Sequence, residues 1–304
     1  MKKFSFLYLI PVLMMLAVPF QTSADDFVRG DCNEDGNVTI ADVTTLIDYL
    51  LSGSWGETPT QPADGDVVTY YVNSVPFNMV YVGGGTFWMG ATDEQAGDYQ
   101  SDETPVNRVH LSSYYIGQTE VTQELWREVM GSNPSDFLGN IKRPVDQVSW
   151  NDCQTFISRL NELTGMNFRL PTEAEWEFAA RGGNKSQGYK YAGSNTIGSV
   201  AWSYSNAGNT THPVATKAPN ELGLYDMSGN VYEWVNDWYD IYTSGEKTDP
   251  TGPSTGYWRV VRGGCWYSNP TNCRVSCRRD DQPSYTGGYT SSGTYVCLGL
   301  RLAL

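Results

Sequence analysis

Oxygen-bearing side chains near the N-terminus are spaced like calcium ligands. They occupy positions 1, 3, 5, 9 and 12 of a loop that begins at Asp31 and ends at Asp42. Gly36 lies at position 6, where such loops turn sharply, and position 7 would contribute a backbone carbonyl. Calcium takes about six to eight hard oxygen ligands, so the pattern predicts a calcium site. The predicted ligands are Asp31, Asn33, Asp35, Asn37, Thr39 and Asp42.

Sulfur is concentrated at the other end of the chain. The six cysteines are Cys32, Cys153, Cys265, Cys273, Cys277 and Cys297, and the last four fall within the final forty residues. Six cysteines over this length do not make a disulfide scaffold, and the spacing leaves the pairing of the C-terminal four open. Cys153 lies on an apolar helical face and is predicted to be a core residue. The C-terminal region is therefore where thiol chemistry would occur.

Composition limits the classes of protein that the chain can belong to. Aromatic residues make up 13% of the 304 residues and charged residues 18%, which excludes a disordered chain and a long coiled coil. The net charge is −14, so nucleic acids and anionic membranes would repel the protein. The two histidines, His110 and His212, are far apart, and a histidine-based zinc site or catalytic triad has little support.

The N-terminus has the features of a secretory signal. Lys2 and Lys3 precede an apolar run over 4–20, and small residues at Thr22 and Ala24 favour cleavage after Ala24. An uncleaved membrane anchor is the alternative. No other stretch is apolar enough to span a bilayer, so the mature chain is expected to have no membrane span. The protein is expected to be periplasmic, cell-surface or secreted.

Four segments follow from these patterns. They are a signal peptide at 1–24, a calcium-loop module at 25–53, a Pro/Gly/Thr-rich linker at 54–70 and a large domain at 71–304. In the large domain, alternation predicts a strand over 77–82. Apolar periodicity and end signals predict three helices, which end at Gly131, Gly165 and Gly182. Ser149 and Thr172 begin the second and third with capping-box patterns.

Two resemblances fit these segments. The loop and the single helix after it resemble one dockerin repeat, although cohesin-binding dockerins carry two repeats and Asp42 replaces the glutamate of an EF-hand. Over 77–304, the chain resembles the formylglycine-generating enzyme family, also called sulfatase-modifying factor. The resemblance implies an α+β fold related to C-type lectins, irregular and loop-rich. It rests on Phe87–Gly90, Tyr115–Thr122, Pro144–Trp150, Phe168–Gly183, Asn220–Trp234, Arg259–Gly264 and Leu298–Leu302.

The family resemblance implies a second calcium site. Asp226 and Glu233 would provide carboxylate oxygens, and Gly229 and Val231 would provide backbone carbonyls. The alternative is a turn whose carboxylates pair with arginine. Arg181 and Arg262 are expected to pair internally with glutamates such as Glu173, Glu177 or Glu233.

The resemblance also implies a test for catalysis. Active members oxidise a cysteine in a sulfatase peptide to formylglycine with two cysteines and, in aerobic forms, copper(I). Counting from Arg262-Gly263-Gly264 places Ser268 at the first cysteine position and Cys273 at the second. A hydroxyl does not replace a soft thiolate ligand of copper(I). Cys273 would be the catalytic thiol only if the enzyme were active.

A second use of the C-terminal region is ligand binding. Residues 258–304 hold six arginines and two aspartates, a local charge of +4, and the segment is rich in the Tyr, Ser, Asn and Gly that dominate binding loops. The alternative is an ordinary polar loop. The predicted ligand-binding residues are Trp266, Tyr267, Ser268, Asn269, Tyr285, Tyr289 and Tyr295.

The leading hypothesis is therefore an exported, non-catalytic binding protein. Its C-terminal loops would meet a protein or glycan ligand, and calcium would be its cofactor. The alternative hypothesis is a formylglycine-generating oxidase that uses copper and acts on a sulfatase peptide.

Overall fold

The computed structural model describes residues 62–95 and 97–304. The chain divides into two compact units, Met1–Gln61 and Pro62–Leu304, and only the second is described here. The predicted signal peptide, the calcium-loop module with its six ligands, and residues 54–61 of the predicted linker lie outside the described residues.

The described unit begins with an antiparallel sheet of order β1-β2-β5. Its strands are β1 (Val67–Val72), β2 (Val75–Val82) and β5 (Tyr114–Gly117). The predicted strand over 77–82 falls within β2. The predicted linker end at residue 70 is wrong, because Val67 to Tyr70 already pair with β2 in β1. The β-branched and aromatic residues Val67, Val68, Thr69 and Tyr70 favour a strand, which explains this difference.

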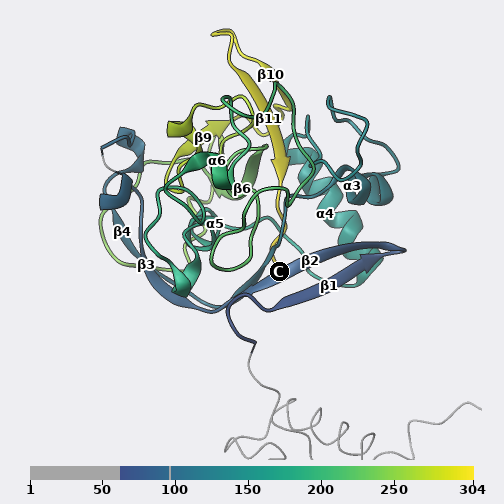
Figure 1. Ribbon diagram of the computed structural model, residues 1–304. Coiled ribbons are helices and arrows are strands. Elements are labelled where there is room, and N and C mark those ends of the chain that lie inside the picture. The colour runs from purple at the N-terminus through teal and green to yellow at the C-terminus, as the bar shows by residue number, and fades with distance from the viewer. Residues whose placement is uncertain (1–61, 96) are drawn as a thin grey trace, which may run out of the picture. The chain divides into compact units, whose positions relative to one another are not determined.

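Two further sheets complete the domain (Figure 1). The five-stranded sheet has the order β10 (Gly287–Tyr289), β11 (Tyr295–Leu300), β6 (Tyr232–Trp238), β8 (Arg259–Arg262) and β9 (Arg278–Asp281). β11 runs parallel to β6, and this places the C-terminal strand in the middle of the domain. The third sheet joins β3 (Gly85–Met89), β4 (Asn107–Leu111) and β7 (Lys247–Thr248).

The three predicted helices are confirmed. They are α3 (Gln123–Met130), α4 (Trp150–Thr164) and α5 (Glu173–Ala180); a short α6 (Ile197–Val200) follows. Ser149 and Thr172 cap α4 and α5 in capping boxes, and left-handed Gly131 and Gly165 end α3 and α4. Single turns of 3₁₀ helix are η2 (Asp93–Gln95), η3 (Ser101–Glu103), η4 (Gly183–Lys185) and η5 (Pro270–Cys273).

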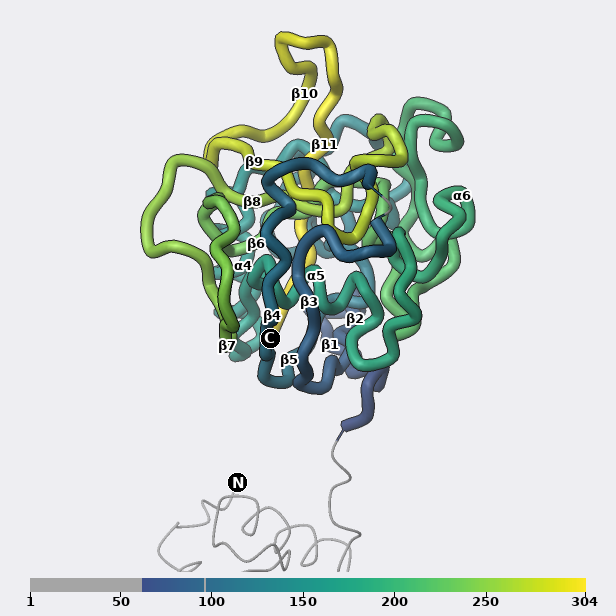
Figure 2. Tube along the Cα trace, turned by 90° about the vertical axis from the view of Figure 1, so that its left-hand side faces the viewer, coloured from purple at the N-terminus to yellow at the C-terminus, as the bar shows by residue number. Residues whose placement is uncertain are grey.

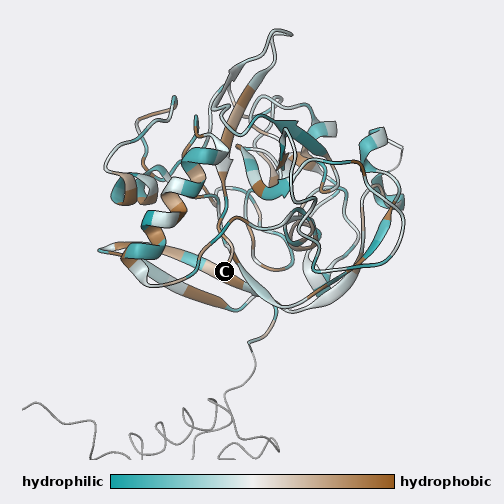
Figure 3. Cartoon of the chain, turned by 180° about the vertical axis from the view of Figure 1, so that it is seen from behind, coloured by the Kyte–Doolittle hydropathy of each residue, from teal (hydrophilic) through white to brown (hydrophobic). Residues whose placement is uncertain are grey.

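α3 and α4 pack on the first sheet through an aromatic core. Trp126 of α3 stacks on Phe156 of α4 with ring centroids 4.8 Å apart, and Cys153 is fully buried beside them, as predicted. Figure 3 shows that α4 carries both apolar and polar residues, as expected of a helix with one buried side. No helix among the described residues is both long and apolar enough to cross a bilayer.

Buried ion pairs join the C-terminal segment to the rest of the domain. Each of four fully or nearly fully buried arginines meets a buried glutamate: Arg262 with Glu177, Arg274 with Glu103, Arg278 with Glu173 and Arg301 with Glu233. The predicted internal roles of Arg181 and Arg262 are confirmed, since both contact Glu177. A buried charge without its partner is strongly unfavourable, so these pairs hold the C-terminal segment in place against the rest of the domain.

Candidate binding surface and cysteine site

The hairpin of β10 and β11 projects from the domain beside the predicted ligand-binding residues. Figures 1 and 2 show it as the yellow segment that extends beyond the neighbouring loops. Tyr289 pairs with Tyr295 across the two strands, and Thr290 N–H donates to the Thr294 carbonyl at 2.8 Å to close the turn. The hairpin thus presents its tip to solvent on a base held in the five-stranded sheet.

Three tyrosines on and beside this hairpin form an accessible group, which we call the tyrosine surface: Tyr204, Tyr267 and Tyr289. The ring centroids of Tyr204 and Tyr267 are 5.4 Å apart and those of Tyr267 and Tyr289 are 6.5 Å apart, all edge to face. Tyr289 is 71% exposed and Tyr204 57% exposed, while Tyr267 is half-buried. Rigid amphipathic rings of this kind provide contact area at low entropic cost.

A buried aromatic layer supports the tyrosine surface. Trp266 lies 5.2 Å from both Tyr267 and Tyr295, centroid to centroid, and Phe137 packs edge to face on Trp266. The Tyr295 hydroxyl donates to Asp136 and accepts from Gln147 Nε2 at 2.8 Å. Burial and the Asp136 carboxylate raise the pKa of Tyr295, so its hydroxyl stays protonated and keeps this anchor.

The structure corrects part of the predicted ligand-binding set. Trp266, Ser268 and Tyr295 are buried, because their side chains pack beneath the exposed tyrosines and cannot form the outer surface. Tyr285 is half-buried and its hydroxyl lies 3.3 Å from the Gly288 carbonyl, so it supports the hairpin. Asn269, Tyr267 and Tyr289 remain accessible.

Tyr204 was missed by sequence reasoning. It lies some sixty residues before Tyr267 in a segment without periodicity. The hydrogen bond from Tyr204 N–H to the Ser268 carbonyl, 3.1 Å, brings the two segments together. No signal in the sequence specifies this long-range pairing.

Ser268 performs a structural role at the first catalytic position. Its hydroxyl accepts a hydrogen bond from Cys265 N–H at 3.0 Å and lies 3.3 Å from the Tyr232 hydroxyl. Its own N–H donates to the Cys265 carbonyl at 2.8 Å. The side chain therefore closes the turn that carries Trp266 and Tyr267.

Cys273 is enclosed and protonated. Its side chain is fully buried against Tyr191 and Val200, and burial raises the pKa of its thiol well above the ordinary value. A Cβ at Gly264, whose φ is +77°, would lie 2.7 Å from the Cys273 sulfur, so glycine permits this close packing. Reactive cysteines have a lowered pKa and solvent access, and Cys273 has neither.

The described cysteines are all reduced and enclosed. In the part of the chain that the structure describes, all five cysteines are free and buried: Cys153, Cys265, Cys273, Cys277 and Cys297. Burial raises the pKa of Cys277 to about 12 and also raises that of Cys265. Within 62–95 and 97–304, no three His, Cys, Asp or Glu residues converge as a metal site. At the first of the two positions that would hold copper(I), Ser268 offers a hydroxyl where this ion prefers a thiolate, so that position does not fit the ion.

The predicted second calcium site is not assembled as a ligand set. Both Glu233 oxygens contact Arg301, at 2.7–3.1 Å, and Trp176 Nε1 donates to Oε2 at 2.7 Å. Asp226 accepts from Ala215 N–H at 2.7 Å through Oδ2, while its buried Oδ1 accepts no hydrogen bond among the described residues. The alternative from the sequence, a turn with an arginine-paired carboxylate, describes Glu233 correctly.

Fold and site together define a loop-rich α+β domain of the sulfatase-modifying type, without the sulfur pair. The family model described as "Sulfatase-modifying factor enzyme 1-like domain" matches residues 66–291, and the chain belongs to this family. A second model, "Dockerin type I domain", matches residues 29–67 and includes the predicted calcium loop. Both resemblances stated from the sequence are confirmed.

Individual relatives carry names that indicate different functions. The chain is 35% identical over 246 residues to the "Chaperone protein LppX" of Paenibacillus barcinonensis, covering 64% of this chain and 81% of the relative. It is 36% identical over 180 residues to the formylglycine-generating enzyme of Streptomyces coelicolor, covering 54% of this chain and 55% of the enzyme. The chain thus spans about half of that enzyme's length.

A solved structure resembles the whole described unit. Treponema denticola variable protein 1 superposes with a TM-score of 0.68 at 34% identity, over 78% of this chain and 98% of that protein. This likeness confirms the predicted fold class.

Proposed function

We propose that this is an exported, non-catalytic member of the sulfatase-modifying factor family that binds a protein or glycan ligand through the tyrosine surface. The observation that carries the proposal is the group of accessible tyrosines on a buried aromatic base, with Tyr289 71% exposed. The serine at the first catalytic position and the buried Cys273 argue against the oxidase alternative. The leader-like N-terminus and the dockerin match support export.

Removing the tyrosine rings should abolish ligand capture. In the double variant Tyr267→Ser/Tyr289→Ser, affinity should fall at least about thirtyfold, since even one aromatic anchor at the centre of an interface contributes about 2 kcal/mol or more. The native chain and the variant would be compared on a glycan array and against extracellular proteins of the producing cells, with affinity measured by biolayer interferometry.

Tyr71→Ser provides the matched control. Tyr71 is 60% exposed on β1, outside the tyrosine surface, so its loss should leave capture unchanged. Equal binding by the double variant and the native chain would place the ligand elsewhere. A second arm incubates the native chain with copper(I) and a cysteine-containing sulfatase peptide, and Cys273-dependent aldehyde formation would establish the oxidase instead.

We also propose that calcium binds the loop from Asp31 to Asp42, on its ligand spacing and the dockerin match. Calorimetry on the full chain should show calcium binding that Asp35→Ala removes. Asp226→Asn should leave this binding intact, because Glu233 is engaged by Arg301. Binding lost in Asp226→Asn but retained in Asp35→Ala would place the ion in the main domain.

A further inference from the structure

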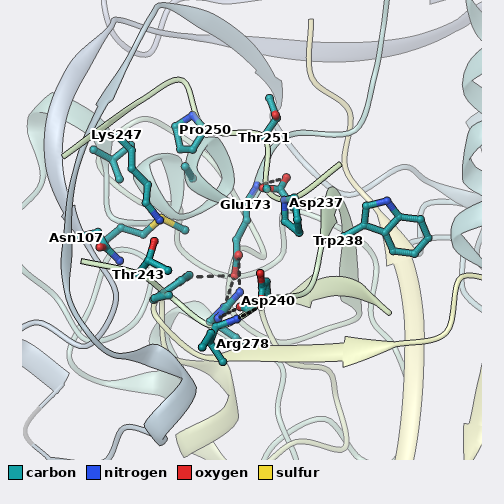
Figure 4. A pocket seen from close by; sticks show the side chains of 17 residues that line it. Asn107, Glu173, Asp237, Trp238, Asp240, Thr243, Lys247, Pro250, Thr251 and Arg278 are labelled. Carbon is teal, nitrogen blue, oxygen red and sulfur yellow. Dashed lines mark hydrogen bonds and ion pairs between the residues drawn. The ribbon is translucent and has the colours of Figure 1, made fainter. Parts of the chain in front are cut away.

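A cavity of about 350 Å³ lies between β4, the beginning of α5, the end of β6 and the loop over 240–253. Figure 4 shows polar side chains that converge on it from these separate elements. Its volume is within the range of about 300–1,000 Å³ that small-molecule sites occupy. None of the residues of the tyrosine surface lines it.

The charges in the cavity floor are already compensated. Arg278 holds Glu173 through Nε at 2.6 Å and through a second nitrogen at 2.9 Å, and the Tyr242 hydroxyl lies 3.3 Å from the same carboxylate. Arg278 also donates to the backbone carbonyls of Asp102 and Asp240, each at 3.0 Å. Neither Arg278 nor Glu173 is therefore available to pair with the charge of a ligand.

Two other buried polar groups line the cavity, and one of them has an unpartnered oxygen. Asn107 is 2% exposed; its Nδ2 donates to the Pro105 carbonyl at 2.8 Å, while its buried Oδ1 accepts no hydrogen bond among the described residues. Asp237 is 5% exposed and accepts Glu173 N–H at 2.9 Å through Oδ2. Burial and the neighbouring Glu173 raise the pKa of Asp237 to about 8.

The walls and mouth add apolar and donor groups. Ile241, Tyr242 and Pro250 contribute apolar surface. Lys247 and Thr251 line the same cavity, and Figure 4 shows both among the side chains around it. The site thus offers an unpaired acceptor, a few donors and apolar walls, with little net charge.

We propose that this cavity binds a neutral saccharide ring. Sugar hydroxyl groups donate and accept at once, so they can satisfy Asn107 Oδ1 and the Asp237 carboxyl group while accepting from Lys247 or Thr251. The C–H faces of the ring can pack on the apolar walls. Leaving a buried acceptor without a donor is unfavourable, and such a ligand removes that cost at Asn107. This site is independent of the tyrosine surface.

The test measures binding of methyl glycosides of glucose, galactose, mannose and N-acetylglucosamine to the full chain by saturation-transfer NMR. Thr251→Trp places a bulky ring at the cavity from an exposed position, where folding should be unaffected. Thr255→Trp makes the same change in the same loop at an exposed residue that does not line the cavity. We expect at least one glycoside to bind, with affinity at least about tenfold lower in Thr251→Trp and unchanged in Thr255→Trp.

Three results would overturn this proposal. They are no binding of any glycoside up to about 20 mM, binding that Thr251→Trp leaves unchanged, and binding of the organic cation spermidine at the cavity in place of every sugar. The Tyr267→Ser/Tyr289→Ser variant separates the two sites. It should retain glycoside binding at the cavity even where it loses the ligand of the tyrosine surface.

Discussion

Replacing Arg301 with methionine is expected to lower the free energy of unfolding by about 3–5 kcal/mol. Arg301 is fully buried and its guanidinium donates to both oxygens of Glu233. It also donates to the carbonyls of Gly117 and Tyr225, each at 2.8 Å. Methionine keeps much of the volume but leaves the buried Glu233 carboxylate without its counter-charge, with Trp176 Nε1 as its remaining donor, and removes the Arg301 donors from two carbonyls.

The neighbouring acids make this loss larger than that of an isolated pair. Burial and the charges of Asp226 and Glu233 raise the pKa of Glu120 well above its usual range, and burial raises that of Asp226 to about 6. Arg301 is the cation that opposes both effects. Removing it should therefore raise the pKa of Glu120 and of Asp226 further, while Glu233 loses its ion pair.

Arg108→Met is the matched control, because the Arg108–Glu246 pair is about half exposed on both sides. Its loss should cost less than about 1 kcal/mol. Urea unfolding followed by tryptophan fluorescence measures both variants. If Arg301→Met and Arg108→Met lowered the free energy of unfolding equally, the buried acids around Arg301 would not depend on it. In the double variant Glu233→Gln/Arg301→Met, part of the stability should return, since no charge is left behind at that position.

Local signals predicted the elements that depend on neighbouring residues. Ser149 and Thr172 mark helix starts because their side chains bond within the same turn, and those bonds do not depend on the rest of the fold. The serine at position 268 likewise follows from counting along one motif. These features could be predicted because sequence distance and spatial distance are both short.

The binding surface could be predicted only in part, because exposure depends on pairing between distant segments. Tyr289 and Tyr295 are the same residue type six positions apart. They lie opposite each other in the hairpin, but Tyr289 is on the edge strand β10 and is exposed, whereas Tyr295 is on β11 and is buried against Trp266. The choice of Arg301 as the partner of Glu233 also joins residues that are 68 positions apart. The family motif that predicts Glu233 as a calcium ligand cannot show that Arg301 pairs with the same carboxylate.

Changing Asp237 to asparagine is expected to flatten the dependence of stability on pH. Burial and Glu173 raise the pKa of Asp237 to about 8, against an ordinary value of about 3.9. Between these values, the folded protein holds a proton that the unfolded chain releases, so stability falls as pH rises. Relative to Asp237→Asn, the native chain should lose about 1.4 kcal/mol per pH unit from about pH 4 to 8, and nothing further above 8.

Asp146→Asn separates this effect from those of other buried acids. Burial raises the pKa of Asp146 to about 6. The difference in unfolding free energy between Asp146→Asn and the native chain should therefore change only between about pH 4 and 6. The slope between pH 6 and 8 should therefore persist in Asp146→Asn and be smaller in Asp237→Asn when unfolding is measured in urea at each pH; Glu120, whose pKa burial also raises, contributes the same slope in both variants. Equal slopes in the two variants would assign the titration to a group other than Asp237. A slope reduced only in Asp237→Asn would show that the folded protein retains the Asp237 proton at neutral pH, where that carboxyl can act as a hydrogen-bond donor in the cavity.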